Sequence, residues 1–537
     1  MKAHLMYRGR DFDPQQILAR REKDQRAKKT DQGLQLLLPW NWQALTQDLG
    51  LDILFNSMAD GETFLFEVAK VALLSSATEV DTILYRQGIY RDCLKQEPLV
   101  RRLYGIAVEA IEGERKNYWS SFGRYPSGTL SRAVDVLQLF MTKLKLLREI
   151  ADDHAGKFKS EGFTRLFAML RRELSDGYLA EIEAHLLNLR FRKGTLISAV
   201  LGQGLKATDY VLRKPHDDKR NWIERLLSPE PVGFTFHLHP RDEGGARALS
   251  EIRDQGVNLV ANALAQSTDH ILSFFEMLRT ELAFYIGCLN LHRRFAVLEQ
   301  PVCIPVACAV DTSRLAFVGL SDASLLLNGR RPVIANDLDA GGKQLIIITG
   351  ANTGGKSTFM RSLGLAQLMM QAGMFVTAEA FTAEICTALF THYKREEDTA
   401  MESGKLDEEL KRMSAIVDGL TPGAMVLFNE SFAATNEREG SEIAAQVTLA
   451  LRERGIKICF VTHLYEFGRR IHAGEMCDAM FLRAERRTDG TRTFRVVEGE
   501  PLQTSYGKDL YDIVFATGRP ANRRVSDAKD VAPLRSA

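Results

Sequence analysis

The spacing of apolar residues divides the chain into a long helical region followed by a region of short strands. Between Trp40 and about Arg294 the apolar positions recur mostly at helical intervals. Residues 246–294 form the longest uninterrupted pattern of this kind, which predicts a helix of roughly 45 residues, or about 65 Å at 1.5 Å per residue. A break near Gly256 or Ser267 would give two shorter helices, and the pattern leaves both options open.

Beyond residue 310 the apolar runs become short. The runs RLAFVGL, SLLL and PVIAN predict antiparallel strands between residues 310 and 340. Three further runs, Leu345–Thr349, Met425–Phe428 and Ile456–Val461, are each followed by polar residues. Buried parallel strands have this composition, and open α/β sheets bind ligands at the carboxyl ends of their strands. We therefore expect the polar residues that follow these runs to lie together at one sheet edge.

The first of these strands leads into a phosphate-binding motif. Residues 350–357 match G-x-x-x-x-G-K-[ST], and a helical pattern begins directly afterwards. The correct order of strand, loop and helix argues against a chance glycine-rich turn. Lys356 is expected to reach the β- and γ-phosphates and the Ser357 hydroxyl to ligate Mg²⁺, with the phosphates at a helix N-terminus. The predicted nucleotide-binding residues are Gly350, Ala351, Asn352, Thr353, Gly354, Gly355, Lys356, Ser357 and Thr358.

The other two strands end in residues suited to ATP hydrolysis. Asn429 and Glu430 follow the strand at 425–428, at the position where one residue usually holds Mg²⁺ through water and the next polarises the attacking water. Glu430 is the candidate general base. Asn429 is neutral but can accept a hydrogen bond from a metal-bound water, which predicts weaker Mg²⁺ binding or slower turnover. His463 follows the strand at 456–461 and is a candidate sensor of the γ-phosphate, although a lone histidine is more often a structural residue.

Composition narrows the class of protein without identifying a partner. The 537 residues carry a net charge of +1, which argues against a wholly basic nucleic-acid coat. Seven scattered cysteines without C-x-x-C spacing suggest neither disulfides nor a zinc site. We find no apolar signal core at the N-terminus and no apolar run long enough to cross a membrane, and we expect a cytoplasmic protein.

One stretch of this neutral chain is basic. Residues 190–220 contain eight Lys or Arg residues and three Asp residues. Such a stretch can contact DNA phosphates, and a solvated helical hairpin tip is the alternative. The candidate DNA contacts are Arg190, Arg192, Lys193, Arg213 and Lys214.

Several motifs together resemble a known family. GANTGGKSTFMRS, preceded by VIAND and followed by LFNESFAATNEREG and FVTHLYEFG, is similar to the ATPase domain of the MutS family of DNA mismatch-repair proteins over roughly residues 330–510. SYGKDLY, EMLRTELAFYIGCLNLH and ILYRQGIYRDCL extend the resemblance more weakly. The resemblance implies a dimer in which each ATP, bound by one subunit, is completed by the partner's signature segment.

The resemblance also assigns roles to particular residues. It implies phosphate, Mg²⁺ and base roles for Lys356, Ser357 and Glu430, and a switch role for His463. The residues implied to face the partner subunit's site are Ser403, Gly404, Glu409, Thr435 and Asn436. The chain also departs from the family at several points, and two of them bear on function. Asn429 replaces the usual Asp, and we find no candidate for a mismatch-reading domain with its aromatic wedge.

The predicted fold is an α/β P-loop NTPase of the ABC type, with a mostly parallel sheet, preceded by a large all-α core and lever domain. We expect a charged arm over 1–39, the helical domain over 40–309, the ATPase domain over 310–520 and a polar tail over 521–537. The expected function is an ATP-gated, homodimeric DNA clamp that uses ATP and Mg²⁺ and recognises DNA structure rather than mismatches. A nucleotide-gated scaffold that does not act on nucleic acid is the alternative, and an ATPase that binds ATP but barely hydrolyses it is a third option.

Overall fold

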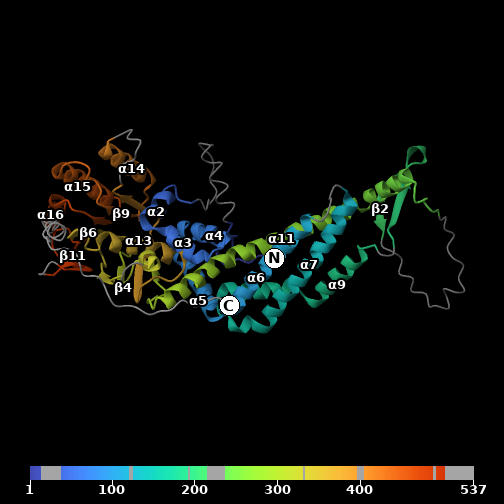
Figure 1. The fold of residues 1–537 in the computed structure, drawn as a ribbon, viewed down its shortest axis with the longest axis horizontal. Coiled ribbons are helices and arrows are strands. Elements are labelled where there is room, and N and C mark those ends of the chain that lie inside the picture. Colours follow the sequence, from blue (N-terminus) through green and yellow to red (C-terminus); the bar gives the residue numbers. More distant parts are fainter. Residues whose placement is uncertain are drawn as a thin grey trace, which may run out of the picture. The chain divides into compact units, whose positions relative to one another are not determined.

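We describe the protein from a computed structural model, which covers residues 1–13, 38–119, 125–191, 194–213, 236–329, 333–395, 404–487 and 491–501. The chain divides into two compact units (Figure 1). Unit 1 contains residues 1–43, 50–307 and 368–376, and unit 2 contains residues 44–49, 308–367 and 377–537. Segments far apart in the sequence therefore build each unit.

Unit 1 is mainly helical. Its helices are α3 (Leu51–Ala59), α4 (Thr63–Leu74), α5 (Val80–Lys95), α6 (Glu97–Trp119), α7 (Pro126–His154), α8 (Glu161–Glu173), α9 (Asp176–Asn188) and α11 (Glu243–Val297), with short 3₁₀ turns η1 (Ala155–Lys157) and η2 (Gln203–Leu205). Helix α2 (Trp42–Leu49) begins in unit 1 and continues in unit 2.

Helix α11 is the longest element among the described residues. It runs for 55 residues, which corresponds to about 80 Å, and it confirms the single-helix option because it continues through Gly256 and Ser267. The Asp242 side chain caps it by accepting a hydrogen bond from the Gly245 N–H. Its buried residues concentrate between Phe274 and Phe295, where it packs on α3, α4, α6 and α7. Figure 1 shows α11 lying along α6 and α7.

The first residues of the chain differ from the charged arm expected over 1–39. Residues 1–13 contribute Leu5, Met6 and Phe12 to the core of unit 1, each with an exposed fraction of 0%. The Glu281 carboxylate, on α11, accepts hydrogen bonds from the Leu5 and Phe12 N–H groups. Residues 14–37, most of the expected arm, lie outside the described residues.

The basic stretch contains a hairpin of strands rather than helices. Strands β1 (Leu196–Leu201) and β2 (Ala207–Arg213) pair antiparallel, which corrects the expected all-α domain and the alternative of a helical hairpin tip. Contact of this stretch with DNA phosphates stays a prediction. The hairpin packs on α11, where a Cβ at Gly256 would lie 2.6 Å from the Ile197 Cδ1. Glycine at position 256 therefore allows the close approach of strand and helix.

Unit 2 is built on a six-stranded sheet in the order β12-β11-β6-β10-β9-β8. Five neighbouring strands are parallel, and β12 is antiparallel to β11. The strands are β6 (Leu345–Gly350), β8 (Leu389–Tyr393), β9 (Met425–Asn429), β10 (Lys457–Val461), β11 (Ala479–Arg486) and β12 (Arg492–Glu498). The structure thus confirms the three predicted strands as parallel neighbours.

The other described elements of unit 2 are helices and a second sheet. The helices are α12 (Ala323–Asn328), α13 (Lys356–Ala372), α14 (Lys405–Gly419), α15 (Glu437–Glu453) and α16 (Tyr465–Ala473). The second sheet is four-stranded, in the order β3-β7-β4-β5, with strands β3 (Val306–Cys308), β4 (Leu315–Leu320), β5 (Asn336–Asp339) and β7 (Ala380–Glu384). RLAFVGL forms a strand as expected, but SLLL forms α12 because Asp322 caps a helix there, accepting a hydrogen bond from the Leu325 N–H.

Register and packing align the functional strand ends. Asn429 pairs with Val461 across β9 and β10, and Val461 pairs with Ile348 of β6. The Phe428 and Phe460 rings stack with centroids 4.7 Å apart in the core beneath α15 and α16. The strands therefore end at one edge, where the polar residues that follow them meet.

Candidate functional site

The loop between β6 and α13 has the backbone of a phosphate cradle. All six residues of β6 are buried. Gly350 and Gly355 have φ values of 105° and 93°, a region that side chains with a Cβ rarely adopt, and Thr353 also has a positive φ of 56°. The loop then enters α13 at Lys356, so the helix N-terminus, which favours a bound anion, follows the loop directly.

The Lys356 side chain lies within this loop. Its Nζ donates hydrogen bonds to the carbonyl oxygens of Gly350 and Ala351 at 3.1 and 2.9 Å. Burial lowers the pKa of the Lys356 ammonium to about 8, and the Glu430 carboxylate opposes this effect. A phosphate would replace the solvation that the buried ammonium lacks, as expected for a phosphate-binding lysine.

Ser357 and Asn429 bring two oxygen atoms together. The Ser357 Oγ donates a hydrogen bond to the Asn429 Oδ1 at 2.9 Å, which joins the first turn of α13 to the end of β9. Hydroxyl and amide oxygens are hard ligands that suit Mg²⁺ when nucleotide phosphates and water complete its shell. The pair therefore fits a Mg²⁺ ion, although it contributes no carboxylate.

Glu430 and His463 form a pair beside the loop. The His463 Nε2 donates to the Glu430 Oε1 at 3.0 Å. This hydrogen bond holds the pKa of Glu430 below its ordinary value, and the nearby charges of Lys356 and Lys394 act in the same direction against the effect of burial. Glu430 has a φ of 56° and its N–H donates to the Val461 carbonyl at 2.9 Å, so the backbone fixes the direction of the side chain.

A polar cleft of about 660 Å³ opens next to this group. Ser357, Thr358 and Asn429 line it together with three cationic side chains. The lining residues are Gln47, Asp48, Ser357, Thr358, Arg361, Tyr393, Lys394, Arg395, Glu408 and Asn429. The three cations outnumber the two acidic residues of the lining, Asp48 and Glu408, and this balance suits an anionic ligand such as a nucleotide polyphosphate.

A buried histidine braces the backbone that follows Glu430, and sequence reasoning missed it. The His392 Nδ1 lies 2.7 Å from the Ser431 Oγ, and its Nε2 lies 3.0 Å from the Glu409 carbonyl oxygen. Burial lowers the pKa of His392 to about 4, so the ring is neutral at physiological pH. His392 lies within a buried strand, and no motif in the sequence marks it.

Glu409 differs from its expected role. We expected its side chain to face a partner subunit, but it is 5% exposed and its Oε2 accepts a hydrogen bond from the Phe432 N–H at 2.9 Å. The carboxylate therefore supports the backbone two residues after Glu430. Gly404 caps α14 and is exposed, whereas Ser403 lies outside the described residues.

Thr435 and Asn436 have local partners. The Asn436 side chain caps α15 by accepting from the Glu439 N–H at 3.0 Å, and the Thr435 hydroxyl donates to the Glu439 carboxylate at 2.6 Å. Asn436 is exposed at the surface. This contact shapes the loop that precedes α15 and leaves it accessible.

A second unpredicted contact comes from the β11–β12 hairpin. The Arg492 Nε donates to the Asn352 carbonyl oxygen of the phosphate loop at 2.6 Å. The sequence contains four arginines between residues 483 and 492, and nothing in it distinguishes the one that reaches the loop.

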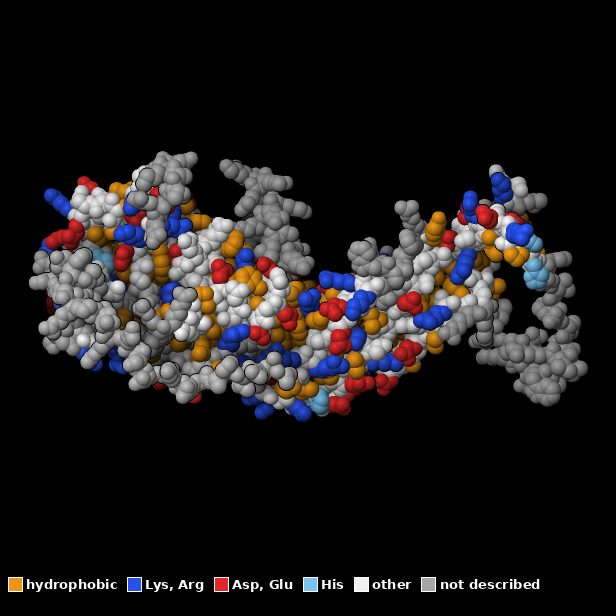
Figure 2. Space-filling model, in the orientation of Figure 1, with side chains coloured by type: hydrophobic (Ala, Val, Ile, Leu, Met, Phe, Trp, Pro, Cys, Tyr) orange, Lys and Arg blue, Asp and Glu red, His pale blue; other side chains and the backbone are white. Residues whose placement is uncertain are grey.

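The candidate DNA contacts lie in unit 1. Arg190 forms an ion pair with Asp135 at 3.0 Å, and the Arg213 Nε donates to the Ser198 Oγ at 2.8 Å within the β1–β2 hairpin. Arg192, Lys193 and Lys214 lie outside the described residues. On the face shown in Figure 2, basic and acidic side chains alternate along the long helices instead of forming a surface of one sign.

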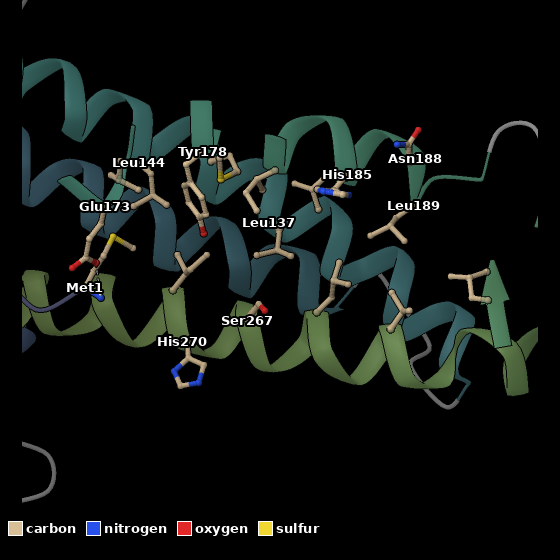
Figure 3. Close-up of a pocket in the computed structure, with 18 of the residues that line it drawn as sticks. Met1, Leu137, Leu144, Glu173, Tyr178, His185, Asn188, Leu189, Ser267 and His270 are labelled. Atoms are coloured by element: carbon tan, nitrogen blue, oxygen red, sulfur yellow. Dashed lines mark ion pairs between the residues drawn. The ribbon is translucent and has the colours of Figure 1, made fainter. Parts of the chain in front are cut away.

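Unit 1 also contains a larger and more apolar cavity, of about 710 Å³, between α7, α9 and α11. Figure 3 shows Leu137, Leu144 and Tyr178 in the space between these helices, with Met1 near Glu173 at one end. None of the loop residues, Glu430 or His463 lines it. The candidate catalytic residues, Glu430 and His463, belong to unit 2 instead.

Within the described residues, no group of three or more His, Cys, Asp or Glu side chains is arranged to hold a metal ion. In the same part of the chain, no helix combines the length and apolarity that crossing a membrane requires.

Comparison with known proteins agrees with this geometry. Residues 78–298 match the MutS2 N-terminal domain, and residues 346–531 match MutS domain V, which is a P-loop ATPase domain. The chain is a MutS-like protein. The second match contains the phosphate loop, Asn429, Glu430 and His463, and the first contains the whole of α11.

Individual relatives match the MutS-like chain over part of its length. Proteins described as DNA mismatch repair protein MutS from Clostridium kluyveri and Thermotoga neapolitana are 31% and 32% identical over 196 and 214 residues, or 34% and 37% of this chain. A protein of the same description from Petrotoga mobilis is 27% identical over 242 residues, or 43% of this chain. The matched regions cover 21%, 27% and 28% of these three relatives.

Proposed function

We propose that this MutS-like chain is an ATP-gated dimeric clamp that binds DNA and recognises its structure rather than mismatches. The observation that carries the proposal is the convergence of Lys356, the Ser357–Asn429 pair and the Glu430–His463 pair at one sheet edge. These are the groups that ATP binding and hydrolysis require, in chemically sensible positions. The MutS domain V match supports the ATPase activity.

Binding of MgATP uses the loop and the two neutral oxygen donors. Loop N–H groups and Lys356 would hold the phosphates, while Ser357 would ligate Mg²⁺ directly and Asn429 through water. Mg²⁺ supplies charge neutralisation for the phosphate oxygens. Because Asn429 contributes no negative charge, we propose weak Mg²⁺ binding and slow turnover.

Hydrolysis would use Glu430 as the proton acceptor. Its lowered pKa keeps the carboxylate ionised at neutral pH. His463 binds Oε1, so Oε2 is the atom proposed to accept the proton of the attacking water. His463 would thus orient the base and respond when the γ-phosphate leaves.

The proposed clamp also requires contacts with a partner subunit and with DNA. Gly404, Thr435 and Asn436, with Ser403, are proposed to face the nucleotide of a partner subunit. Arg213 and the neighbouring basic residues are proposed to contact DNA phosphates, and Arg190 would have to exchange its Asp135 partner for DNA. We place the protein in the cytoplasm.

The alternative is a nucleotide-gated scaffold without nucleic acid. The Arg190–Asp135 ion pair and the mixed charges along the helices favour it (Figure 2). The two functions differ in their response to DNA and salt, because phosphate contacts release counterions.

The deciding experiment is steady-state ATP hydrolysis with Mg²⁺ at about 100 mM salt, without DNA and then with linear and branched duplexes. The clamp predicts stimulation that is larger for branched DNA and disappears at high salt. Arg213→Gln should weaken DNA binding and reduce its salt dependence by about one counterion, whereas Arg454→Gln on the exposed end of α15 should change neither. Robust turnover that ignores every nucleic acid would favour the scaffold.

A further inference from the structure

The β11–β12 hairpin packs directly against the phosphate loop. Gly350 pairs with Ala484 of β11, and a Cβ on Gly354 would lie 2.7 Å from the Ala484 Cβ. A Cβ on Gly355 would lie 3.1 Å from the Phe494 carbonyl oxygen of β12. The loop glycines thus serve two purposes, since they leave room for phosphate and also for this hairpin.

The hairpin backbone directs Arg492 toward the loop. The β11–β12 register shifts between Ala484 and Arg486, and Phe494 has a φ of 60°. Such an irregularity re-aims the side chains next to it. Arg492 is half-buried, and its Nε donates to the Asn352 carbonyl oxygen at 2.6 Å.

The orientation of the Asn352 carbonyl matters for anion binding by the loop. A phosphate cradle requires backbone N–H groups that point inward, so its carbonyl oxygens must be held outward, away from the anion. Two donors bind the Asn352 oxygen, namely Arg492 and, at 2.7 Å, the Thr353 hydroxyl. The bond from Arg492 is charge-assisted and therefore the stronger of the two.

The guanidinium is also electrostatically close to Lys356. Its positive charge contributes to the lowering of the pKa of the Lys356 ammonium. Two neighbouring cations repel each other, and a bound anion reduces the repulsion. Polyphosphate would relieve this repulsion, whereas a ligand without phosphates would not.

We propose that Arg492 is a positioning residue that holds the phosphate loop in its anion-binding conformation through the Asn352 carbonyl. This inference rests on the proposed ATP binding at the loop. It adds to the nucleotide site a residue that lies outside the phosphate-binding motif of residues 350–357. Arg492 acts through the loop and does not contact the reacting atoms, so it should affect nucleotide affinity and leave the chemical step nearly unchanged.

The test compares Arg492→Met, Arg492→Lys and the matched control Arg495→Met in the full chain. Arg495 lies on the same strand but is exposed. We would measure the Kd for MgATP and for ADP, KM and kcat for ATP hydrolysis, and the melting temperature. Lys356→Ala serves as the variant in which phosphate binding is lost.

Arg492→Met should raise the Kd for MgATP and for ADP, and the KM for ATP, about tenfold or more, because it removes one charge-assisted hydrogen bond, while kcat changes less than about twofold. Arg492→Lys should recover a large part of the affinity, and Arg495→Met should match the wild type. The melting temperature should remain that of the wild type in all three variants.

Three results would overturn the inference. These are wild-type affinity in Arg492→Met, an equal loss in Arg495→Met, or a loss in Arg492→Met that Arg492→Lys does not relieve and that accompanies a lower melting temperature. If the wild-type chain itself fails to bind MgATP, the proposed function fails, and this inference fails with it. If the wild type binds MgATP and Lys356→Ala abolishes this binding, the proposed ATP site stands, and the Arg492 variants then test this inference alone.

Discussion

The Ser357 hydroxyl and the Asn429 amide oxygen lie 2.9 Å apart and are hydrogen-bonded. In the related ATPase pattern an Asp usually stands at the position of Asn429, so this site has one negative charge fewer. The geometry of the pair remains suited to Mg²⁺, and the difference is one of charge.

Asn429→Asp should therefore strengthen Mg²⁺ binding. Restoring the negative charge next to the Ser357 hydroxyl should lower the Mg²⁺ concentration for half-maximal ATP hydrolysis by about tenfold, because carboxylate charge tunes the affinity of such sites. A Mg²⁺ titration of turnover measures this effect. Asn262→Asp, at an exposed position on α11, is the control. An unchanged Mg²⁺ requirement would show that Asn429 does not act on the metal.

Glu430→Gln should separate ATP binding from hydrolysis. The amide keeps the shape of the side chain but cannot accept the proton of water, so turnover should fall by about 10²–10⁴-fold while MgATP still binds. Single-turnover hydrolysis and equilibrium binding measure the two quantities, and size-exclusion chromatography reports whether an ATP-bound dimer accumulates. Glu453→Gln, at the exposed end of α15, should behave as wild type. Undiminished turnover in Glu430→Gln would remove this residue from the role of base.

Glu281 should make the stability of the fold depend on pH. Burial raises the pKa of Glu281 to about 8, while hydrogen bonds from the Leu5, Phe12 and Met6 N–H groups oppose this effect. Between the unfolded-state value of 4.5 and about 8 the folded chain retains a proton that the unfolded chain has lost. The free energy of unfolding should therefore fall as pH rises through this window, by up to about 1.4 kcal/mol per pH unit.

Urea unfolding followed by circular dichroism between pH 5 and 9 tests the Glu281 contribution. Glu281→Gln does not ionise, so it should remove this contribution to the slope, although its amide leaves one N–H donor poorly paired and lowers stability at pH 5. Glu251→Gln, exposed on the same helix, should retain the wild-type slope. A wild-type slope in Glu281→Gln would assign the pH dependence to other groups.

Gly440 and Gly105 should respond oppositely to alanine. A Cβ at Gly440 would lie 2.4 Å from the Phe432 carbonyl oxygen, whereas a Cβ at Gly105 has no neighbour within 4 Å. Gly440→Ala should reduce the free energy of unfolding by about 1–3 kcal/mol through overpacking, and should also lower turnover because Phe432 follows Glu430 closely. Gly105→Ala should be stabilising by about 0.5–1 kcal/mol, since alanine favours helix. Chemical denaturation of both variants measures the contrast, and equal stabilities would contradict the close contact at Phe432.

Much of the candidate site could be predicted because its signals are local. A glycine-rich loop between a β-branched strand and a helix specifies its own backbone conformation, and apolar runs ending in polar residues specify a sheet edge. The pairing of Glu430 with His463 follows from that edge, because neighbouring parallel strands bring their ends together. The apolar spacing of residues 246–294 likewise predicted a long helical segment, but only the structure shows that α11 continues through Gly256 and Ser267 without a break.

Other features depend on contacts between distant parts of the chain. Leu5 and Phe12 lie beside a charged stretch but are buried, and their N–H groups are satisfied by Glu281, about 270 residues later. Glu409 is of a residue type that is usually exposed, but its carboxylate is buried and accepts a hydrogen bond from the Phe432 N–H. Arg492 is one of several similar arginines until the β11–β12 register directs it to Asn352.

The sequence by itself determined the parallel strands, the phosphate loop and the residues at the strand ends, because hydrophobic periodicity and glycine conformation act over a few residues. Only the tertiary structure decided which polar groups are buried and which partners satisfy them. The physical reason is that a buried hydrogen-bonding group needs a partner, and that partner is supplied by whichever distant segment the folded chain brings within about 3 Å.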